Sequence, residues 1–177
     1  LYSTPAGKNT IVIVLADHGD GMGSHRMVTK QVSFYEEMTN VPFIIAGPGI
    51  HPRQKPVEDL LTQPTIDLLP TLCELAGIPV PSSKPGISLA PFLKGEKQKR
   101  QHPYAASEWH SEYEVTVSPG RMIRSPRYKY THYLEGNGEE LYDMLKDKGE
   151  RRNLAHDPKY SKILAEHRAL LDDYIRR

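Results

Sequence analysis

The sequence is short of several features that would assign a protein to a broad class. It has one cysteine among 177 residues, which excludes an internal disulfide framework and a zinc site built from several cysteines. Its 23 basic and 22 acidic side chains leave a formal net charge of +1, so no global field attracts nucleic acid or an anionic membrane. No run approaches the roughly 18 consecutive apolar residues of a membrane span. We therefore expect neither a nucleic-acid partner nor a membrane span.

The first ten residues also lack a basic segment that leads into an apolar one, so no signal peptide is expected in this stretch. What the chain does have is two apolar, β-branched runs, Asn9–Ala16 and Val41–Gly47. Each is typical of a strand covered on both faces, as in a parallel sheet. Between them, Gln31–Thr39 has apolar residues at helical spacing. The order of strand, helix and strand predicts a parallel βαβ unit in an α/β layer.

A second helix is predicted around "DLLPTLCELAG", where Asp67 caps the start, Pro70 lies in the first turn and Gly77 ends the helix. Cys73 falls on its apolar side, and a free cysteine there is expected to be a buried core residue. A long irregular connection and a charged stretch follow. They predict a boundary near residue 97, which gives a first domain of residues 1–97 and a second of residues 98–177.

Beyond this boundary the sequence changes to short, half-alternating, tyrosine-rich segments separated by turn residues. This pattern predicts a four-stranded antiparallel sheet. The segment that begins at Pro158 has apolar residues near helical spacing, so it predicts an amphipathic helix that covers one face of that sheet.

The stretch "VLADHGDGMGSHRMVTK" carries the residues with the most specific chemistry. Asp17 and His18 follow the first predicted strand, where open α/β sheets bind ligands, and a carboxylate with an imidazole can supply half the shell of a divalent cation. His25 and Lys30 return toward the same end, and Lys30 offers a point charge to a sulfate or phosphate group. The glycines fit no dinucleotide, P-loop or EF-hand pattern. A glycine-rich turn with ordinary polar residues remains the alternative.

This stretch and the segments after it resemble the metal-binding loop and C-terminal subdomain of the type I, formylglycine-dependent sulfatases of the alkaline phosphatase superfamily. The resemblance covers nearly the whole chain in order. It rests on Asp-His-Gly, a following histidine and lysine, and then on the segments "FYEEMTNVPFII", "IDLLPTLCELAGIPVP", "GISLAPFLKG", "MIRSPRYKYTHY", "EELYDM" and "NLA". It implies the C-terminal portion of an alkaline-phosphatase-like α/β sheet domain plus a small α+β subdomain.

The resemblance also implies roles for individual residues. Asp17 and His18 would be ligands of a divalent cation, usually Ca²⁺, and Lys30 would contact the sulfate and neutralise its charge as a catalytic residue. His25 would line the substrate pocket and assist catalysis, while His110 would face the substrate from the C-terminal subdomain. The family's reaction is attack of a hydrated formylglycine on sulfur. A periplasmic, extracellular or lysosomal location is typical of the family.

The chain departs from the family pattern in lacking the nucleophile motif [CS]-x-P-x-R. Cys73 is followed by Glu-Leu-Ala, and in "STPAG" a glycine, Gly7, stands where the arginine is needed. The family's early Asp-Asp pair and its central lysine and histidine are missing as well. We therefore expect the nucleophile and the rest of the metal site in an N-terminal part of the same domain, and no activity from this chain alone. An exposed apolar face or sheet edge, with possible oligomerisation through it, is also expected.

Two other functions stay open. A phosphatase, phosphonate hydrolase or phosphodiesterase of the same superfamily would share the metal loop, since the discriminating nucleophile lies outside this chain. A non-catalytic module could instead bind sulfated glycans through Trp109, His110 and the tyrosine-rich strands, although sheet packing also explains these aromatic residues. For a sulfatase, a sulfated carbohydrate is the expected substrate, in preference to a simple aryl sulfate.

Overall fold

The computed structural model describes residues 3–28, 33–58, 60–83, 85–98, 101–110, 118–136 and 138–176. The chain forms two compact units, each described by itself below. Unit 1 comprises Leu1–Asp17 and Val41–His102, and unit 2 comprises His18–Asn40 and Pro103–Arg177. None of the helices in the described part of the chain is both long enough and apolar enough to cross a membrane.

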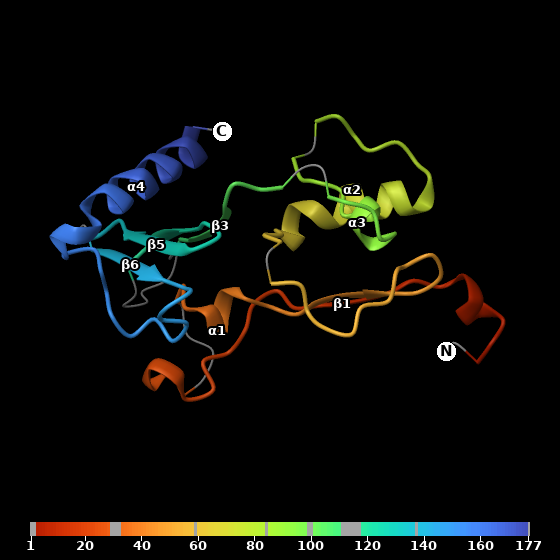
Figure 1. The fold of residues 1–177 in the computed structure, drawn as a ribbon, viewed down its shortest axis with the longest axis horizontal. Coiled ribbons are helices and arrows are strands. Elements are labelled where there is room, and N and C mark those ends of the chain that lie inside the picture. The colour runs from red at the N-terminus through yellow and green to blue at the C-terminus, as the bar shows by residue number, and fades with distance from the viewer. Residues whose placement is uncertain are drawn as a thin grey trace. The chain divides into compact units, whose positions relative to one another are not determined.

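Unit 1 contains a two-stranded sheet of β1 (Val12–Leu15) and β2 (Phe43–Ala46) (Figure 1). The strands are antiparallel, with Val12 opposite Ala46 and Leu15 opposite Phe43. The predicted parallel βαβ unit is therefore wrong. A parallel pair needs a crossover that returns the chain to the starting end, usually through a helix packed on the sheet. Here residues 18–40 belong to unit 2, and the apolar runs by themselves do not encode strand direction.

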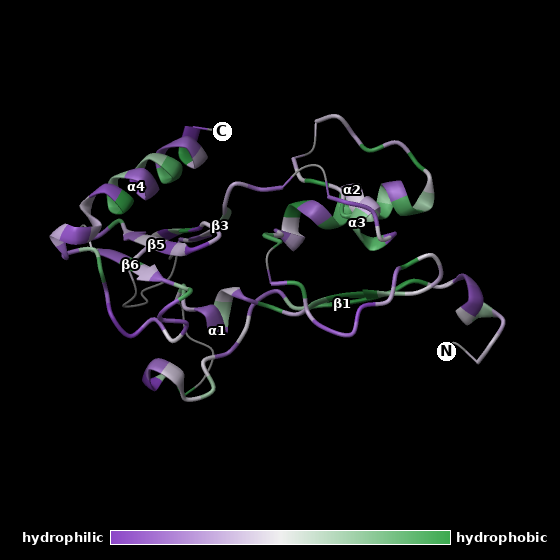
Figure 2. Cartoon of the chain, in the orientation of Figure 1, coloured by the Kyte–Doolittle hydropathy of each residue, from purple (hydrophilic) through white to green (hydrophobic). Residues whose placement is uncertain are grey.

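The expected burial of both faces of these strands is also not observed. Val14 is 51% exposed and Ile44 is 57% exposed. Figure 2 shows this pair of strands as an apolar segment, so the sheet carries apolar surface that the described residues leave open. The exposed apolar face that the sequence predicts is therefore present, whereas oligomerisation through it stays a prediction.

Unit 1 also contains α2 (Pro64–Ala76), α3 (Ala90–Leu93) and a short 3₁₀ helix, η1 (Ala6–Asn9). Helix α2 begins three residues before Asp67 and ends at Gly77, which is left-handed with φ 69°, as the sequence predicts. The buried Asp67 carboxylate accepts a hydrogen bond from the backbone N–H of Gln63 at 2.7 Å, so Asp67 caps the helix from inside its first turns. Pro70 lies in the helix interior, so the predicted helix start at Asp67, with Pro70 in the first turn, is wrong. Cys73 is buried, as predicted.

Unit 2 contains the predicted four-stranded antiparallel sheet, in the order β3 (Ala105–Trp109), β4 (Gly120–Arg124), β5 (Tyr128–Tyr133) and β6 (Glu139–Asp143) (Figure 1). The C-terminal helix α4 (Ser161–Arg176) follows the 3₁₀ helix η3 (Pro158–Tyr160). Figure 2 shows apolar segments alternating with polar ones along α4. The core of the unit combines both elements, with Ile123, Tyr130 and Leu141 from the sheet and Leu164 and Leu171 from the helix.

The two faces of this sheet have different partners. In the antiparallel register, Ile123, Tyr130 and Leu141 lie opposite one another and point to the helix side. The next row, Arg124, Lys129 and Tyr142, points to the other side. That side is contacted by residues 34–39, which include the short helix α1 (Glu36–Thr39). This contact places residues 18–40 in unit 2, whereas the domain boundary near residue 97 stays a prediction.

Candidate functional site

The segment between β1 and α1 carries several of the residues that the sequence predicts for the site. Residues 18–28 are here called the histidine loop. They include the 3₁₀ helix η2 (Ser24–Arg26) and contact α1. The backbone N–H of Gly19 donates to Met38 O at 2.9 Å. A Cβ atom on Gly19 would lie 1.7 Å from Glu37 O, so only glycine permits this close approach.

His18 is held in an orientation that suits a metal ligand. Its Nδ1 lies 2.8 Å from Gly19 O, and because a carbonyl only accepts, Nδ1 is the donor and Nε2 is the ring atom directed away from this contact. Asp17, an exposed residue two positions after the last residue of β1, precedes it in the chain and belongs to unit 1. A carboxylate and an imidazole fit a divalent cation, but two ligands do not complete its coordination shell.

His25 lies deeper in the loop, packed against α1. Its ring stacks on that of Tyr35, with 3.7 Å between the centroids and an interplanar angle of 1°. Its Nε2 is 3.9 Å from Glu37 Oε2, and its side chain is 18% exposed. One ligand atom each from His25, Glu37 and the buried Glu150 lie within 4.8 Å of one another, a spacing that could also hold a metal ion.

Three non-glycine residues of the histidine loop have left-handed backbones: Met22 with φ 47°, His25 with φ 50° and Arg26 with φ 63°. Such conformations cost energy and persist where the surrounding contacts impose them, and they cluster at functional sites. Of these three residues, His25 is constrained by the stack of its ring on Tyr35.

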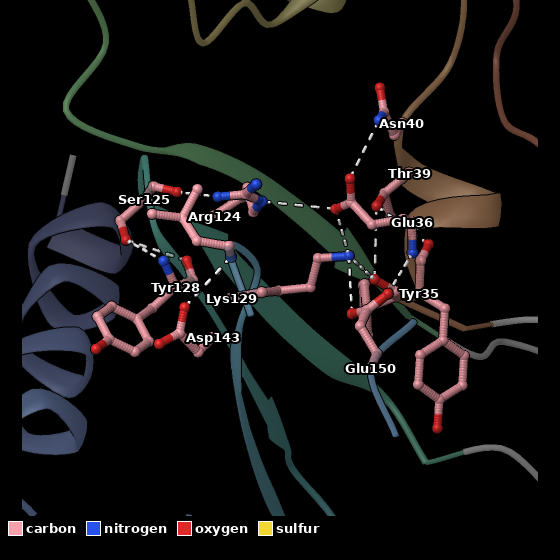
Figure 3. Close-up of polar contacts among 12 residues, drawn as sticks. Tyr35, Glu36, Thr39, Asn40, Arg124, Ser125, Tyr128, Lys129, Asp143 and Glu150 are labelled. Atoms are coloured by element: carbon pink, nitrogen blue, oxygen red, sulfur yellow. Dashed lines mark hydrogen bonds and ion pairs between the residues drawn. The ribbon is translucent and has the colours of Figure 1, made fainter. Parts of the chain in front are cut away.

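A buried ionic network beneath the loop was not predicted from the sequence (Figure 3). The Lys129 ammonium group on β5 lies 2.7 Å from Glu36 Oε1 and 3.0 Å from Glu150 Oε1, and it donates to Phe34 O at 2.9 Å. Glu150 Oε2 accepts from the backbone N–H of Glu36 at 2.7 Å. Arg124 Nε also lies near the same Glu36 Oε1 atom, at 3.6 Å. The only sequence signal is a lysine alternating with tyrosines, which is also typical of a solvated strand face.

The carboxylates of this network differ in their titration. Burial by itself would raise the pKa of Glu36, but the charges of Lys129 and Arg124 outweigh it and hold the pKa below its ordinary value. Burial raises the pKa of Glu150, and the charge of Lys129 offsets this only in part. Burial also raises the pKa of the nearby Glu140, a residue of β6, and the negative charge of Glu150 raises that pKa further. Negative charge is therefore crowded around Glu150.

The remaining site residues are less fully placed. Lys30 lies outside the described residues. His110 is exposed and directly follows β3, while Trp109 is the last residue of β3 and is partly buried. His18 and His25 both lie on the histidine loop, and their roles and those of Asp17, Lys30 and His110 stay predictions.

Residues 23–177 match the family described as N-sulphoglucosamine sulphohydrolase, C-terminal. The chain belongs to this sulfatase family. The match begins within the histidine loop and continues through β2 of unit 1 and the whole sheet of unit 2, so the family assignment made from the sequence motifs is confirmed.

Among curated relatives, this sulfatase chain is 78% identical over 177 residues to a Delta 4,5-hexuronate-2-O-sulfatase of Bacteroides thetaiotaomicron. The match covers 100% of the chain and 37% of that protein. A solved structure of a 2-O GAG sulfatase superposes with a TM-score of 0.95 at 78% identity, over 100% of this chain and 38% of that one. The phosphonate monoester hydrolase of Agrobacterium radiobacter gives a TM-score of 0.81 at 26% identity, over 98% of this chain and 36% of that one. The predicted fold class, part of an α/β domain with a small α+β subdomain, is confirmed.

Proposed function

We propose that this chain forms part of a sulfuric ester hydrolase that acts on a sulfated glycan, with the 2-O-sulfate of a hexuronate as the favoured substrate. The observation that carries the proposal is the 78% identity, over the whole chain, to a Delta 4,5-hexuronate-2-O-sulfatase. Because the chain spans 37% of that relative, the remaining catalytic groups are sought elsewhere in the protein.

In this proposal Asp17 and His18 contribute a carboxylate oxygen and the His18 Nε2 atom to a divalent cation, with Ca²⁺ as the favoured ion. The cation acts as a Lewis acid and as a template for the sulfate. Lys30 neutralises charge that develops on the sulfate oxygens, and His25 lines the pocket beside it. His110 contacts the sugar from the C-terminal subdomain.

The described residues offer no place for the formylglycine nucleophile. Cys73 is buried within helix α2 and is followed by Glu-Leu-Ala, which departs from the required motif. No step of the reaction is therefore assigned to Cys73, and the nucleophile is expected outside this chain. The isolated chain should hydrolyse no sulfate ester even with added Ca²⁺, and turnover by a pure sample would contradict this assignment.

A second candidate is hydrolysis of a phosphonate monoester, which the superposition on the hydrolase of Agrobacterium radiobacter favours. The two chains share the fold of this region, so the two activities are separated by the substrate. Parallel assays with an unsaturated 2-O-sulfated disaccharide and with a phosphonate monoester distinguish them.

The decisive experiment uses the full-length protein that contains this chain. Asp17→Asn and His18→Gln should each lower cation affinity by at least about 100-fold, since even outer-shell losses cost about 10–100-fold. Sulfate release from a 2-O-sulfated hexuronate disaccharide should fall with it. Asp20→Asn is the matched control, because the Asp20 carboxylate is exposed and accepts from Met22 N within the loop. Equal behaviour of Asp17→Asn and Asp20→Asn would contradict the metal assignment.

The non-catalytic module is tested with the isolated chain. Calorimetric titration with sulfated oligosaccharides should give no binding if the chain is part of a catalytic domain. Binding that is lost on Trp109→Ala would support the non-catalytic module instead. It would show that an aromatic side chain binds the sugar by stacking, which needs no nucleophile.

A further inference from the structure

The ammonium group of Lys129 contacts three polar groups that lie outside its own sheet. Its side chain is 1% exposed, and an ammonium group has three donors. The Lys129 Nζ atom donates to Phe34 O at 2.9 Å. It also forms ion pairs with Glu36 Oε1 at 2.7 Å and Glu150 Oε1 at 3.0 Å, which Figure 3 shows. Strand β5 pairs with β4 and β6 through its backbone, so the ladder does not need this side chain. A buried charge must be paired, and here two of its three partners belong to residues 34–36.

Glu150 binds the backbone of the same segment, residues 34–36, through its side chain. Its Oε2 accepts from the N–H of Glu36 at 2.7 Å, while its Oε1 lies 3.0 Å from Lys129 Nζ. Glu150 is buried and left-handed, with φ 48°, a conformation that costs energy for a residue with a side chain. Lys129 and Glu150 thus bind Glu36 through its side chain and its backbone together.

The segment fixed in this way is the one on which the histidine loop rests. Met38 O accepts from Gly19 N at 2.9 Å, next to His18. The Tyr35 ring stacks on His25 at 3.7 Å. A continuous set of contacts therefore runs from β5 through residues 34–38 to His25 and to Gly19, the neighbour of His18, and all of it lies within unit 2.

We propose that Lys129 is a positioning residue that, through Glu36 and Glu150, sets the placement of the histidine loop for catalysis. It lies at least 101 residues from that loop in sequence and acts without contacting the substrate or the cation. The inference rests on the proposed sulfatase function, because it assigns His18 and His25 to the site that the loop presents.

The test compares Lys129→Met with Arg127→Met in the full-length protein. Arg127 pairs with Asp143 at 2.7 Å and lies over the Tyr128 ring, and within the described residues neither contact involves residues 34–38. Lys129→Met should lower kcat by about 100-fold, the scale of a misplacement of about 1 Å, and should change KM much less. Hydrogen exchange of residues 18–28 should accelerate about tenfold while the amides of β4 and β6 stay protected. Arg127→Met should leave both readouts near wild type.

Two further variants keep the test decisive if Lys129→Met folds poorly. Glu36→Gln retains the Lys129–Glu150 pair and should shift both readouts in the same direction by less. Lys129→Arg restores a buried cation and should recover part of kcat. If exchange of the loop rises only together with exchange of β4–β6, Lys129 supports the sheet alone and the inference is wrong. If the wild-type protein releases no sulfate, the proposed function fails, whereas the exchange data still decide whether Lys129 places the loop.

Discussion

Replacing Gly19 with alanine tests whether the close approach of the histidine loop to α1 matters. The new Cβ would lie 1.7 Å from Glu37 O, whereas real Cβ contacts below 3.0 Å essentially never occur. The two backbones must therefore separate by roughly 1.3 Å, the difference between these distances. The hydrogen bond from Gly19 N to Met38 O cannot survive this separation unchanged. We expect a loss of about 1–3 kcal/mol in the free energy of unfolding of unit 2, the usual cost of overpacking.

The same displacement moves His18, the neighbour of Gly19. In the full-length protein, a shift of about 1 Å should lower kcat by about 100-fold. Urea denaturation and sulfate release are the two assays. Gly138→Ala is the control, because its Cβ would make ordinary contact with Tyr133 at 3.5 Å. If Gly19→Ala matches Gly138→Ala in both assays, the loop does not need this approach and the reasoning is refuted.

Three further predictions concern unit 2. Burial lowers the pKa of His167, whose Nε2 lies 2.9 Å from Ser125 Oγ. The unfolded state therefore binds more protons, and the free energy of unfolding should fall as the pH drops below about 6.5. In urea titrations His167→Gln should flatten this pH dependence, whereas a change at the exposed His156 should leave it unaltered. Arg168 holds the pKa of Glu139 at about 2, so the stability that this pair provides should be lost between about pH 4.5 and pH 2, and Glu139→Gln should remove that part of the acid transition. Leu141 is 0% exposed, and Leu141→Ala should cost about 2–5 kcal/mol by thermal or urea unfolding.

Local patterns in the sequence predicted much of the fold of unit 2. Tyrosine-rich alternation predicted the antiparallel sheet, and helical spacing after Pro158 predicted α4, because both elements bury a face whose period is visible in the sequence. Gly77 correctly marked the end of α2, since a left-handed residue there requires little else from the fold. The predicted parallel direction of β1 and β2 was wrong, because a continuous apolar run has the same composition in either strand direction.

The candidate site also has a part that the sequence predicts and a part that only the fold shows. Asp17, His18, His25 and Lys30 stand close together in the sequence, so their motif was visible. The contact of Lys129 with Glu36 and Glu150 joins residues that are far apart along the chain, and each alone resembles a solvated charge. Only the fold brings them together, and no periodicity in one sequence encodes such a pair.

The open pair of strands in unit 1 has a consequence for how this chain melts. A two-stranded sheet is marginal in water, whereas unit 2 has a sheet, a helix and a shared core. Heating the isolated chain should therefore give two transitions, and calorimetric and van't Hoff enthalpies should disagree. Limited proteolysis should cut first in residues 41–58 and spare the segment from β4 to α4, so a digestion-resistant C-terminal fragment is the expected product.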